Sequence, residues 1–413
     1  MARVEIQVPR RHGPAASKFV SSQQLFNAFI EQDLETGGLS LYGAPGLSLF
    51  CTTGTTGRVR GLHNFNGVLL AVVGATLYTV SPAGAATSRG SIAGIDAVMI
   101  SNNGLEAVIV GDQQSYAWDG STLAQITDAD FQQASSCDFL DQYLVFSKRN
   151  SGQFFLSALA DAASYDALDV ATAEGRPDNL LRVIVQNREV ILLGVKSCEG
   201  WYNAGDSDFP LVRDQTYAEL GIIGVHATCI IDNSVAMIAH DKTVRILRSG
   251  SWQIISDPDI SNIIESWSDA SVTRAFSLTW RGHQYLVLRN PDGCLIWDAS
   301  LPLPISWSAR KSQGMETWRV GCCETMAAGA EWNGAIILGD DSNGLLYRWD
   351  ASVYTEHGAR ITTEMATRTT GPKGRPSTPG ARRLLRLGCQ QDSQVVGGTG
   401  GGRGEAPSGR GGC

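Results

Sequence analysis

The sequence has little of what metal-binding, membrane-spanning and secreted proteins depend on. Its 413 residues contain no apolar run of the roughly 18 residues that a transmembrane helix needs. Nine cysteines are scattered without a C-x-x-C pair, and the six histidines never pair at metal-ligand spacing. The basic opening, MARVEIQVPRR, lacks the apolar stretch of a signal peptide. We therefore expect no membrane-spanning segment, no metal, no cofactor, and reduced thiols in a protein made in a cytoplasm.

Positive charge is also scarce. The net charge is -8, whereas a dedicated nucleic-acid binder normally carries a basic surface. The imbalance is uneven, because residues 371–413 hold seven Lys/Arg and two Asp/Glu, whereas residues 1–370 hold 26 and 39. The main body therefore carries a net charge of -13.

Catalytic motifs are missing as well. The sequence has no G-x-S-x-G elbow, no H-E-x-x-H and no P-loop. Asp340 and Asp341 in LGDDSNG could bind Ca²⁺, but this pattern is more typical of acids that shape a turn. Glu174 and Asp178 in ATAEGRPDN could form the acid pair of a glycosidase. The Gly-Arg-Pro turn between them excludes a helix that would place them on one face, so we interpret them as loop-fixing groups.

What is abundant is the pattern of short β-strands. Aliphatic runs such as GVLLAVV, QYLVFS and GAIILG are separated by Asn-Gly and Asp-Gly signals, which supply the positive φ angles of tight turns. Each unit includes a later strand in which an aromatic residue precedes Asp, Gly or Ser. The equivalent positions are Tyr78, Tyr116, Phe154, Trp201, Val244, Leu295 and Tyr347. Their intervals of 38 to 52 residues are typical of propeller blades. The predicted fold is all-β, with a β-propeller-like body of about six to seven blades; a pair of β-sandwiches is the alternative.

Helical periodicity is weak throughout the sequence. Short helices are predicted over 21–34 near the N-terminus and over 161–171 between blades.

The sequence also suggests how the chain is divided. We assign 1–58 to an extended or helical docking segment and 59–358 to the propeller-like body. A final strand or linker follows over 359–370.

The last segment, 371–413, differs in composition from the rest. It holds 13 glycines and has no aromatic residue, Ile or Met. Such a segment cannot bury enough apolar surface to offset the entropy of ordering, which predicts a disordered tail. The abrupt end of the strand pattern would also fit a shift of reading frame near residue 370, which the other two nucleotide frames would test.

Several blocks of sequence together resemble one family. SLYGAPGLSLF is followed by GRVRGLHNFNGVLLAVVGATLYTV, and then by DFLDQYLVFSKRNSGQFFLSALADAASYDALDVATAEGRPDNLLRV. These blocks are similar to tail proteins of short-tailed bacteriophages, known as packaged-DNA stabilisation proteins or as tail accessory, nozzle or hub proteins. The resemblance continues through LGDDSNGLLYRWD and covers roughly Ser21 to Thr370. The Gly/Arg-rich tail departs from it.

The resemblance implies a structural protein of the virion tail without enzymatic activity, assembled in the bacterial host cytoplasm. Copies would form a ring, with a hexamer favoured, below the portal and its adaptor, or head completion, protein. That ring would extend the DNA channel, help to retain packaged DNA, and carry distal spike, fibre or needle proteins. DNA would pass without sequence-specific binding.

Three segments are candidates for contacts between subunits or with other tail proteins: the loop at 174–178, residues 211–224 and residues 300–320. The candidate residues are Glu174, Arg176, Asp178, Trp307, Arg310, Trp318 and Arg319. Asp178 or Asn179 is expected to pin the turn through backbone N–H groups. The last four candidates belong to residues 300–320, which we expect to expose the two tryptophans beside the arginines. Ordinary inter-blade loops are the alternative for 211–224 and for 300–320. For the whole chain, a glycan-binding or glycan-cleaving propeller enzyme and a propeller interaction scaffold remain open.

Overall fold

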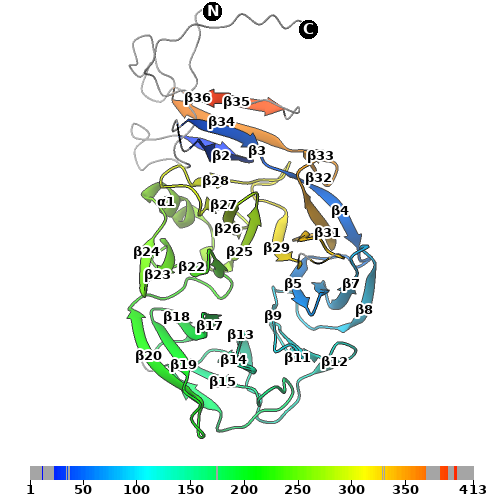
Figure 1. The fold of residues 1–413 in the computed structure, drawn as a ribbon, viewed down its shortest axis with the longest axis vertical. Coiled ribbons are helices and arrows are strands. Elements are labelled where there is room, and N and C mark those ends of the chain that lie inside the picture. Colours follow the sequence, from blue (N-terminus) through cyan, green and yellow to red (C-terminus); the bar gives the residue numbers. More distant parts are fainter. Residues whose placement is uncertain are drawn as a thin grey trace, which may run out of the picture.

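The structure is a computed structural model. It describes His12 and residues 23–33, 35, 38–173, 175–327, 329, 331–368, 382–388 and 395–397. Seven four-stranded antiparallel units surround a common centre and form the blades of a propeller (Figure 1). The predicted all-β propeller is thus confirmed, with seven blades.

The blades follow chain order. Blade 1 is β5 (Val59–Phe65), β6 (Val68–Val73), β7 (Thr76–Val80) and β8 (Ala86–Ser91). Blade 2 is β9 (Met99–Asn102), β10 (Ala107–Val110), β11 (Ser115–Trp118) and β12 (Leu123–Gln125). Blade 3 is β13 (Ala134–Leu140), β14 (Tyr143–Lys148), β15 (Gln153–Leu156) and β16 (Val170–Thr172). Blade 4 is β17 (Leu180–Gln186), β18 (Glu189–Gly194), β19 (Cys198–Asn203) and β20 (Leu211–Ala218).

Blade 5 is β21 (Thr228–Ile231), β22 (Ser234–Ile238), β23 (Val244–Arg248) and β24 (Ser251–Ile254). Blade 6 is β25 (Arg274–Trp280), β26 (His283–Asn290), β27 (Gly293–Asp298) and β28 (Trp307–Ala309). Its sheet continues outward through β1 (Gln24–Phe26), β34 (Thr362–Arg368) and β35 (Arg382–Gly388). Blade 7 is β29 (Val320–Thr325), β30 (Ile336–Asp340), β31 (Leu345–Asp350) and β4 (Gly46–Thr52).

Blade 7 closes the propeller with a strand from the other end of the chain. β4 pairs with β31 in antiparallel register, with Leu47 opposite Trp349 and Cys51 opposite Leu346. The body therefore includes β4, which lies before the boundary at residue 59 that the sequence suggested. Two ends that are about 300 residues apart in the chain hold each other in one sheet.

Smaller elements lie beside blades 6 and 7. β2 (Ala28–Gln32), β3 (Leu39–Gly43) and β36 (Val395–Gly397) form a three-stranded sheet, and β32 (Thr355–Glu356) pairs with β33 (Ala359–Arg360). These strands and the outer strands of blade 6 lie together at one end of the molecule, at the top of Figure 1. β35 and β36 fall within the predicted tail, 371–413; the rest of that tail lies outside the described residues.

The core consists of layers between neighbouring blades. One cluster joins Leu70 and Val72 of blade 1 to Val98 and Ile109 of blade 2, and comparable clusters fill the other interfaces. A middle strand is therefore covered on both faces, and β6 is buried at five of its six residues. Strands buried on both faces appear in the sequence as continuous apolar runs rather than as alternating ones. This is why the aliphatic runs are so prominent.

The repeat that the sequence suggested is present at the level of single strands. The seven positions taken as equivalent lie in β7, β11, β15, β19, β23, β27 and β31. Each of these is the third strand of its blade in sheet order, counted from β5, β9, β13, β17, β21, β25 and β29. The Asn-Gly signals also form the tight turns expected of them, since Asn66 and Gly67 have φ angles of 50° and 84° between β5 and β6.

Both predicted helices are absent. Residues 24–32 form β1 and β2, separated by Asn27 with a left-handed φ of 54°. Pairing with β28, β34 and β3 overrides the weak local helical pattern. Residues 162–169 form bends and turns before β16 begins at Val170, because the carboxylates of Asp161 and Asp166 accept hydrogen bonds from backbone N–H groups two residues later, each 2.9 Å long. Such local bonds compete with a helix.

The α-helix that does occur, α1 (Pro258–Ser266), connects blades 5 and 6 and precedes a single 3₁₀ turn, η1 (Ala270–Val272). Asp257 caps α1 by accepting a hydrogen bond of 3.0 Å from the Ile260 N–H, and Pro258 occupies its first turn. Both are standard features of a helix start. At nine residues, α1 is too short to cross a membrane, and no other helix in the described part of the chain is long and apolar enough to do so.

One buried carboxyl group should make stability depend on pH. Burial raises the pKa of Glu324, on the inner strand of blade 7, to about 7. Because the folded pKa lies above the unfolded one, stability is greatest below the unfolded pKa and falls as the pH rises through about 7.

Glu324→Gln is expected to raise the free energy of unfolding at pH 8 by about 2–3 kcal/mol, with a smaller gain toward pH 5. Urea denaturation at both pH values measures this, with exposed Glu316→Gln as the control. A gain that is equal at both pH values would contradict the prediction.

Candidate functional site

A polar cavity lies at one mouth of the propeller axis. Its volume is about 820 Å³, and residues of blades 1, 2, 3, 5, 6 and 7, or of the loops beside them, line it. Its charged and titratable residues are Arg58, Asp96, Asp112, Arg149, His226, Arg274, Arg289 and Asp341. The cavity is therefore built where the blades converge, from residues that are far apart in the sequence.

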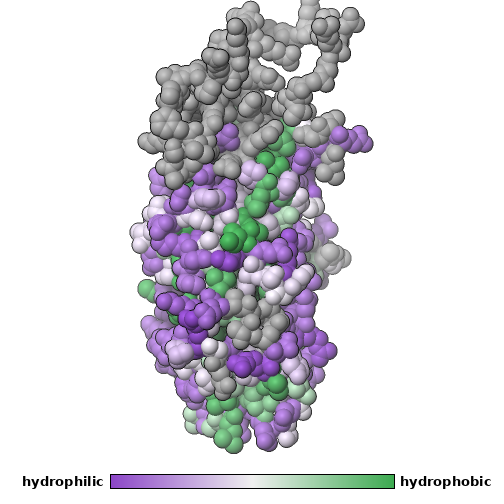
Figure 2. Space-filling view, turned by 90° about the vertical axis from the view of Figure 1, so that its left-hand side faces the viewer, coloured by the Kyte–Doolittle hydropathy of each residue, from purple (hydrophilic) through white to green (hydrophobic). Residues whose placement is uncertain are grey.

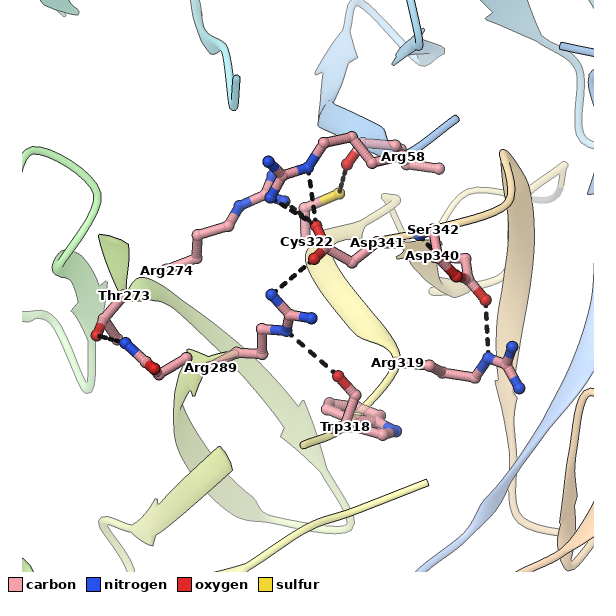
Figure 3. A network of polar contacts seen from close by, with 12 residues as sticks. Arg58, Thr273, Arg274, Arg289, Trp318, Arg319, Cys322, Asp340, Asp341 and Ser342 are labelled. Carbon is pink, nitrogen blue, oxygen red and sulfur yellow. Dashed lines mark hydrogen bonds and ion pairs between the residues drawn. The ribbon is translucent and has the colours of Figure 1, made fainter. Parts of the chain in front are cut away.

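Three arginines converge on one carboxylate at this mouth (Figure 3). Arg58 donates to Asp341 Oδ1 through Nε at 3.0 Å and through Nη2 at 2.8 Å. Arg274 Nη1 reaches the same oxygen at 2.9 Å, and Arg289 Nη1 forms an ion pair of 2.6 Å with Oδ2. Arg58 precedes blade 1, Asp341 follows β30 of blade 7, and the other two arginines belong to blade 6. The cluster therefore joins three consecutive blades around Asp341.

A second charged group forms the wall at blades 1 to 3. Arg60 is fully buried and donates to Asp112 Oδ1 at 2.8 Å. It also donates to the backbone carbonyls of Asp96, at 2.6 Å, and of Ala93, at 3.1 Å. Arg149 donates to three carbonyl oxygens at the mouth, including that of Gly111 at 2.9 Å, and it forms no ion pair with a carboxylate among the described residues. Its charge is thus held by peptide dipoles alone.

The electrostatic consequence is a positive field at the mouth. Burial is the main factor that lowers the pKa of Arg274, and the neighbouring Arg58 and Arg289 act in the same direction. Burial, followed by the charges of Arg274 and two further arginines, lowers the pKa of His226 to about 3. This imidazole is therefore neutral at physiological pH. The arginines that line the mouth outnumber its aspartates by four to three, although the chain as a whole is acidic.

The first predicted contact loop is described from Gly175 onward, because Glu174 lies outside the described residues. The Arg176 guanidinium forms an exposed ion pair with Glu219. Asp178 accepts hydrogen bonds from the Lys196 N–H at 2.6 Å and from the Ser197 hydroxyl at 2.7 Å. The expectation that Asp178 pins its own turn is therefore wrong, because its carboxylate fixes the turn between β18 and β19 instead. The expected contact with other subunits remains a prediction.

The predicted contact segment at 300–320 does not expose its tryptophans. Trp307 and Trp318 are 2% and 0% exposed, and Arg310 is 2% exposed. The prediction of their exposure is wrong because Trp307 packs into the hydrophobic cluster that includes blades 5 and 6 and α1, and Trp318 packs into the cluster between blades 6 and 7. Arg319, which is mostly buried, donates to Asp340 at 2.7 Å.

Arg310 instead links the inner part of this region to the β32–β33 hairpin. Its guanidinium lies 4.2 Å from the ring centroid of Trp318 and 5.0 Å from that of Trp349. Its Nη2 donates to Glu356 Oε1 at 2.6 Å and to the Pro45 carbonyl at 2.7 Å. Segments of blades 6 and 7 and of the β32–β33 hairpin therefore meet at one buried ion pair.

Other clusters of polar side chains that could suggest a catalytic or metal site have structural roles instead. The Asp340 carboxylate accepts hydrogen bonds from Arg319 and Ser342, which is the turn-shaping role expected of it. His283 contacts both Asp298, at 2.7 Å, and Ser300, at 3.3 Å, through the same Nδ1 atom. A Ser-His-Asp triad needs the two ring nitrogens to face different partners. Across the described part of the chain, no three His, Cys, Asp or Glu side chains form a group that could hold a metal.

Solved structures offer only distant likenesses. YCF48 bound to a D1 peptide is 13% identical over 75% of this chain and 96% of its own, with a TM-score of 0.44. PorZ, a surface component of the type-IX secretion system of Porphyromonas gingivalis, is 11% identical over 79% of this chain and 43% of its own, with a TM-score of 0.42. No curated protein sequence matches the chain. At these values the likenesses carry no argument about function.

A family-level match is much more extensive. Residues 25–354 match the family described as bacteriophage P22 Gp10, β-propeller, a phage stabilisation family. The matched region runs from β1 through blade 7, so it contains all seven blades, and it includes the segment whose motifs resembled short-tailed phage tail proteins. The chain belongs to this family of phage structural β-propeller proteins.

Proposed function

We propose that the chain is a subunit of a ring in the phage tail that extends the path of the packaged DNA. The ring, with a hexamer favoured, would lie below the portal and its adaptor protein, help to retain the genome, and carry distal spike, fibre or needle proteins. It would act as a non-enzymatic part of the virion, without a cofactor, assembled in the host cytoplasm. Membership of a phage stabilisation family supports a virion role.

The size of the cavity at the propeller's mouth supports the ring proposal. The cavity at its mouth has a volume of about 820 Å³, which lies in the range of small-molecule pockets. Duplex DNA, whose major groove alone is about 12 Å wide, needs a much larger passage. A DNA path formed by this protein would therefore lie between several copies rather than through one propeller. Closed rings are the usual way in which identical subunits surround a channel.

The surface also has features suited to subunit contacts. Figure 2 shows one side of the molecule that is mostly hydrophilic, with hydrophobic residues in a band across its upper half and again at its lower end. Leu159 and Leu168, between β15 and β16, are 56% and 80% exposed. β15 lies at that end in Figure 1, and Arg176 follows the same connection. Grouped apolar exposure beside charged residues is typical of interaction surfaces.

Electron microscopy of the purified full chain tests the proposal. A closed ring with a central channel is the expected result, and a particle that stays monomeric at the concentrations of assembly would refute it. An acidic channel wall is expected from the net charge of -13 over residues 1–370. A strongly basic wall would remove the argument that DNA slides through without being held.

A pair of charge reversals tests the predicted contact loop separately. Arg176→Glu is expected to weaken the ring, because it places a like charge beside Glu219 and at the proposed contact. Arg188→Glu, which reverses an exposed arginine on another turn of the same blade, is the matched control. Sedimentation velocity compares the two. Equal ring stability in both variants would exclude this loop as the contact while leaving the ring itself to the microscopy.

A further inference from the structure

The charges at the propeller mouth do not balance. Five guanidinium groups surround this cavity or back its wall, namely Arg58, Arg60, Arg149, Arg274 and Arg289. The carboxylates there are Asp96, Asp112 and Asp341. The mouth therefore carries an excess of two positive charges, within a chain whose net charge is -8. Burying like charges is costly, so an excess of this kind needs a compensating interaction.

The hydrogen-bond inventory shows where the unused capacity lies. Asp341 Oδ1 accepts three hydrogen bonds and Oδ2 faces a further guanidinium, so this carboxylate has little capacity left. Each guanidinium has five N–H donors. Among the described residues, Arg58 Nη1 and Arg289 Nη2 form no hydrogen bond. The Arg58 side chain is 32% exposed and lines the cavity, so it is available to a ligand that enters from solvent.

We propose that this mouth is a binding site for a phosphate-class dianion, held by the free guanidinium donors of Arg58 and Arg289 beside Asp341, with Arg149 contributing long-range attraction. A phosphate group carries a charge of about -1.5 to -2 at neutral pH, which matches the excess of two positive charges. Planar guanidinium groups bind phosphate oxygens in a bidentate manner and are the preferred side chains for them.

The ligand is a small anion rather than nucleic acid. The cavity volume of about 820 Å³ suits inorganic phosphate or a phosphate monoester and is too small for a duplex. The neutral imidazole of His226 lines the same cavity and can donate one hydrogen bond to a phosphate oxygen. This site needs only one propeller, so it stands independently of the proposed ring.

Calorimetric titration of the full chain with inorganic phosphate, in chloride buffer of constant ionic strength, tests the proposal. Saturable binding to one site per chain is expected. Arg58→Gln should weaken it about tenfold or more, the effect of losing a hydrogen bond to a charged group. Arg248→Gln removes a similarly exposed arginine that also pairs with one aspartate, but away from this cavity, and should leave binding unchanged. Titration with AMP separates the two sources of phosphate, because a monoester that binds equally well shows that the site accepts an esterified phosphate.

Asp341→Asn distinguishes a ligand site from a structural ion cluster. Both Arg58→Gln and Asp341→Asn remove the same ion pair, so a merely structural role predicts that they act alike. In a phosphate site they act in opposite directions, since loss of the aspartate charge should strengthen phosphate binding severalfold. If Asp341→Asn does not fold, the comparison of Arg58→Gln with Arg248→Gln still decides. The absence of saturable binding, or equal phosphate affinity in those two variants and the wild type, would overturn the proposal.

Discussion

Replacing Glu356 with glutamine is expected to lower the free energy of unfolding by about 3–5 kcal/mol, the cost of breaking a buried ion pair from one side. Glu356 is 3% exposed, and its two oxygens accept hydrogen bonds from Arg310, Ser312 and Trp318. Glutamine keeps the shape of the side chain but turns an NH₂ group toward donors. The Arg310 guanidinium, enclosed between two indole rings, would lose its counter-charge and could not reach water.

Urea denaturation measures this loss of stability, and two further variants serve as the control and the comparison. Glu265→Gln removes an exposed partner of Lys242 and serves as the control, with little change expected. Replacing both Arg310 and Glu356 with methionine should destabilise less than Glu356→Gln alone, because no charge is then left buried without a partner. If Glu356→Gln lowered the free energy of unfolding as little as the control does, water or a rearrangement would be stabilising the unpaired charge of Arg310.

Leu47→Ala is expected to lower the free energy of unfolding by about 2–5 kcal/mol, the usual cost of emptying a buried leucine site. Leu47 lies on β4 and is 4% exposed in the cluster that contains Trp318, Leu338 and Tyr347. The cost is large because this cluster joins blade 6 to blade 7 at the point where the propeller closes. Weakening it affects the sheet that holds the two ends of the chain together.

The same strand provides a close control. Leu49 is two residues farther along β4 and is 61% exposed, so Leu49→Ala should change stability by no more than about 0.5 kcal/mol. Thermal or urea unfolding compares the two leucines directly. If the two variants lost equal stability, the closing strand would be contributing through its backbone pairing rather than through the packing of Leu47.

The blades could be predicted from the sequence because their signal is local and repeated. Seven aromatic or aliphatic positions recur in the third strand, and each middle strand, being covered on both faces, is a continuous apolar run. The short N-terminal strands could not be predicted in this way. β1 pairs with β34, more than 330 residues away, and β2 pairs with β3, so tertiary pairing overrode the local pattern.

The mouth of the propeller could not be found from the sequence for the same reason. Arg58 and Asp341 are separated by 283 residues, and nothing near either one marks it as part of a cluster. Asp341 was correctly placed at a turn after β30, but its three arginine partners depend on the order of the blades. The tryptophans at 307 and 318 were misjudged because a loop-like composition concealed the clusters into which they pack.

Closure by β4 also determines when the last blade can form during synthesis of the chain. β4 is made early, but its partner β31 emerges only after nearly 300 further residues have been synthesised. At about 5–20 residues per second, this leaves β4 without its partner for roughly 15 to 60 s. During that time, the unpaired edge of one chain can meet the last blade of another chain on the same message. Exchange of β4 between neighbouring chains would then link propellers during synthesis. The rate of translation would therefore affect the fraction of chains that fold as separate propellers.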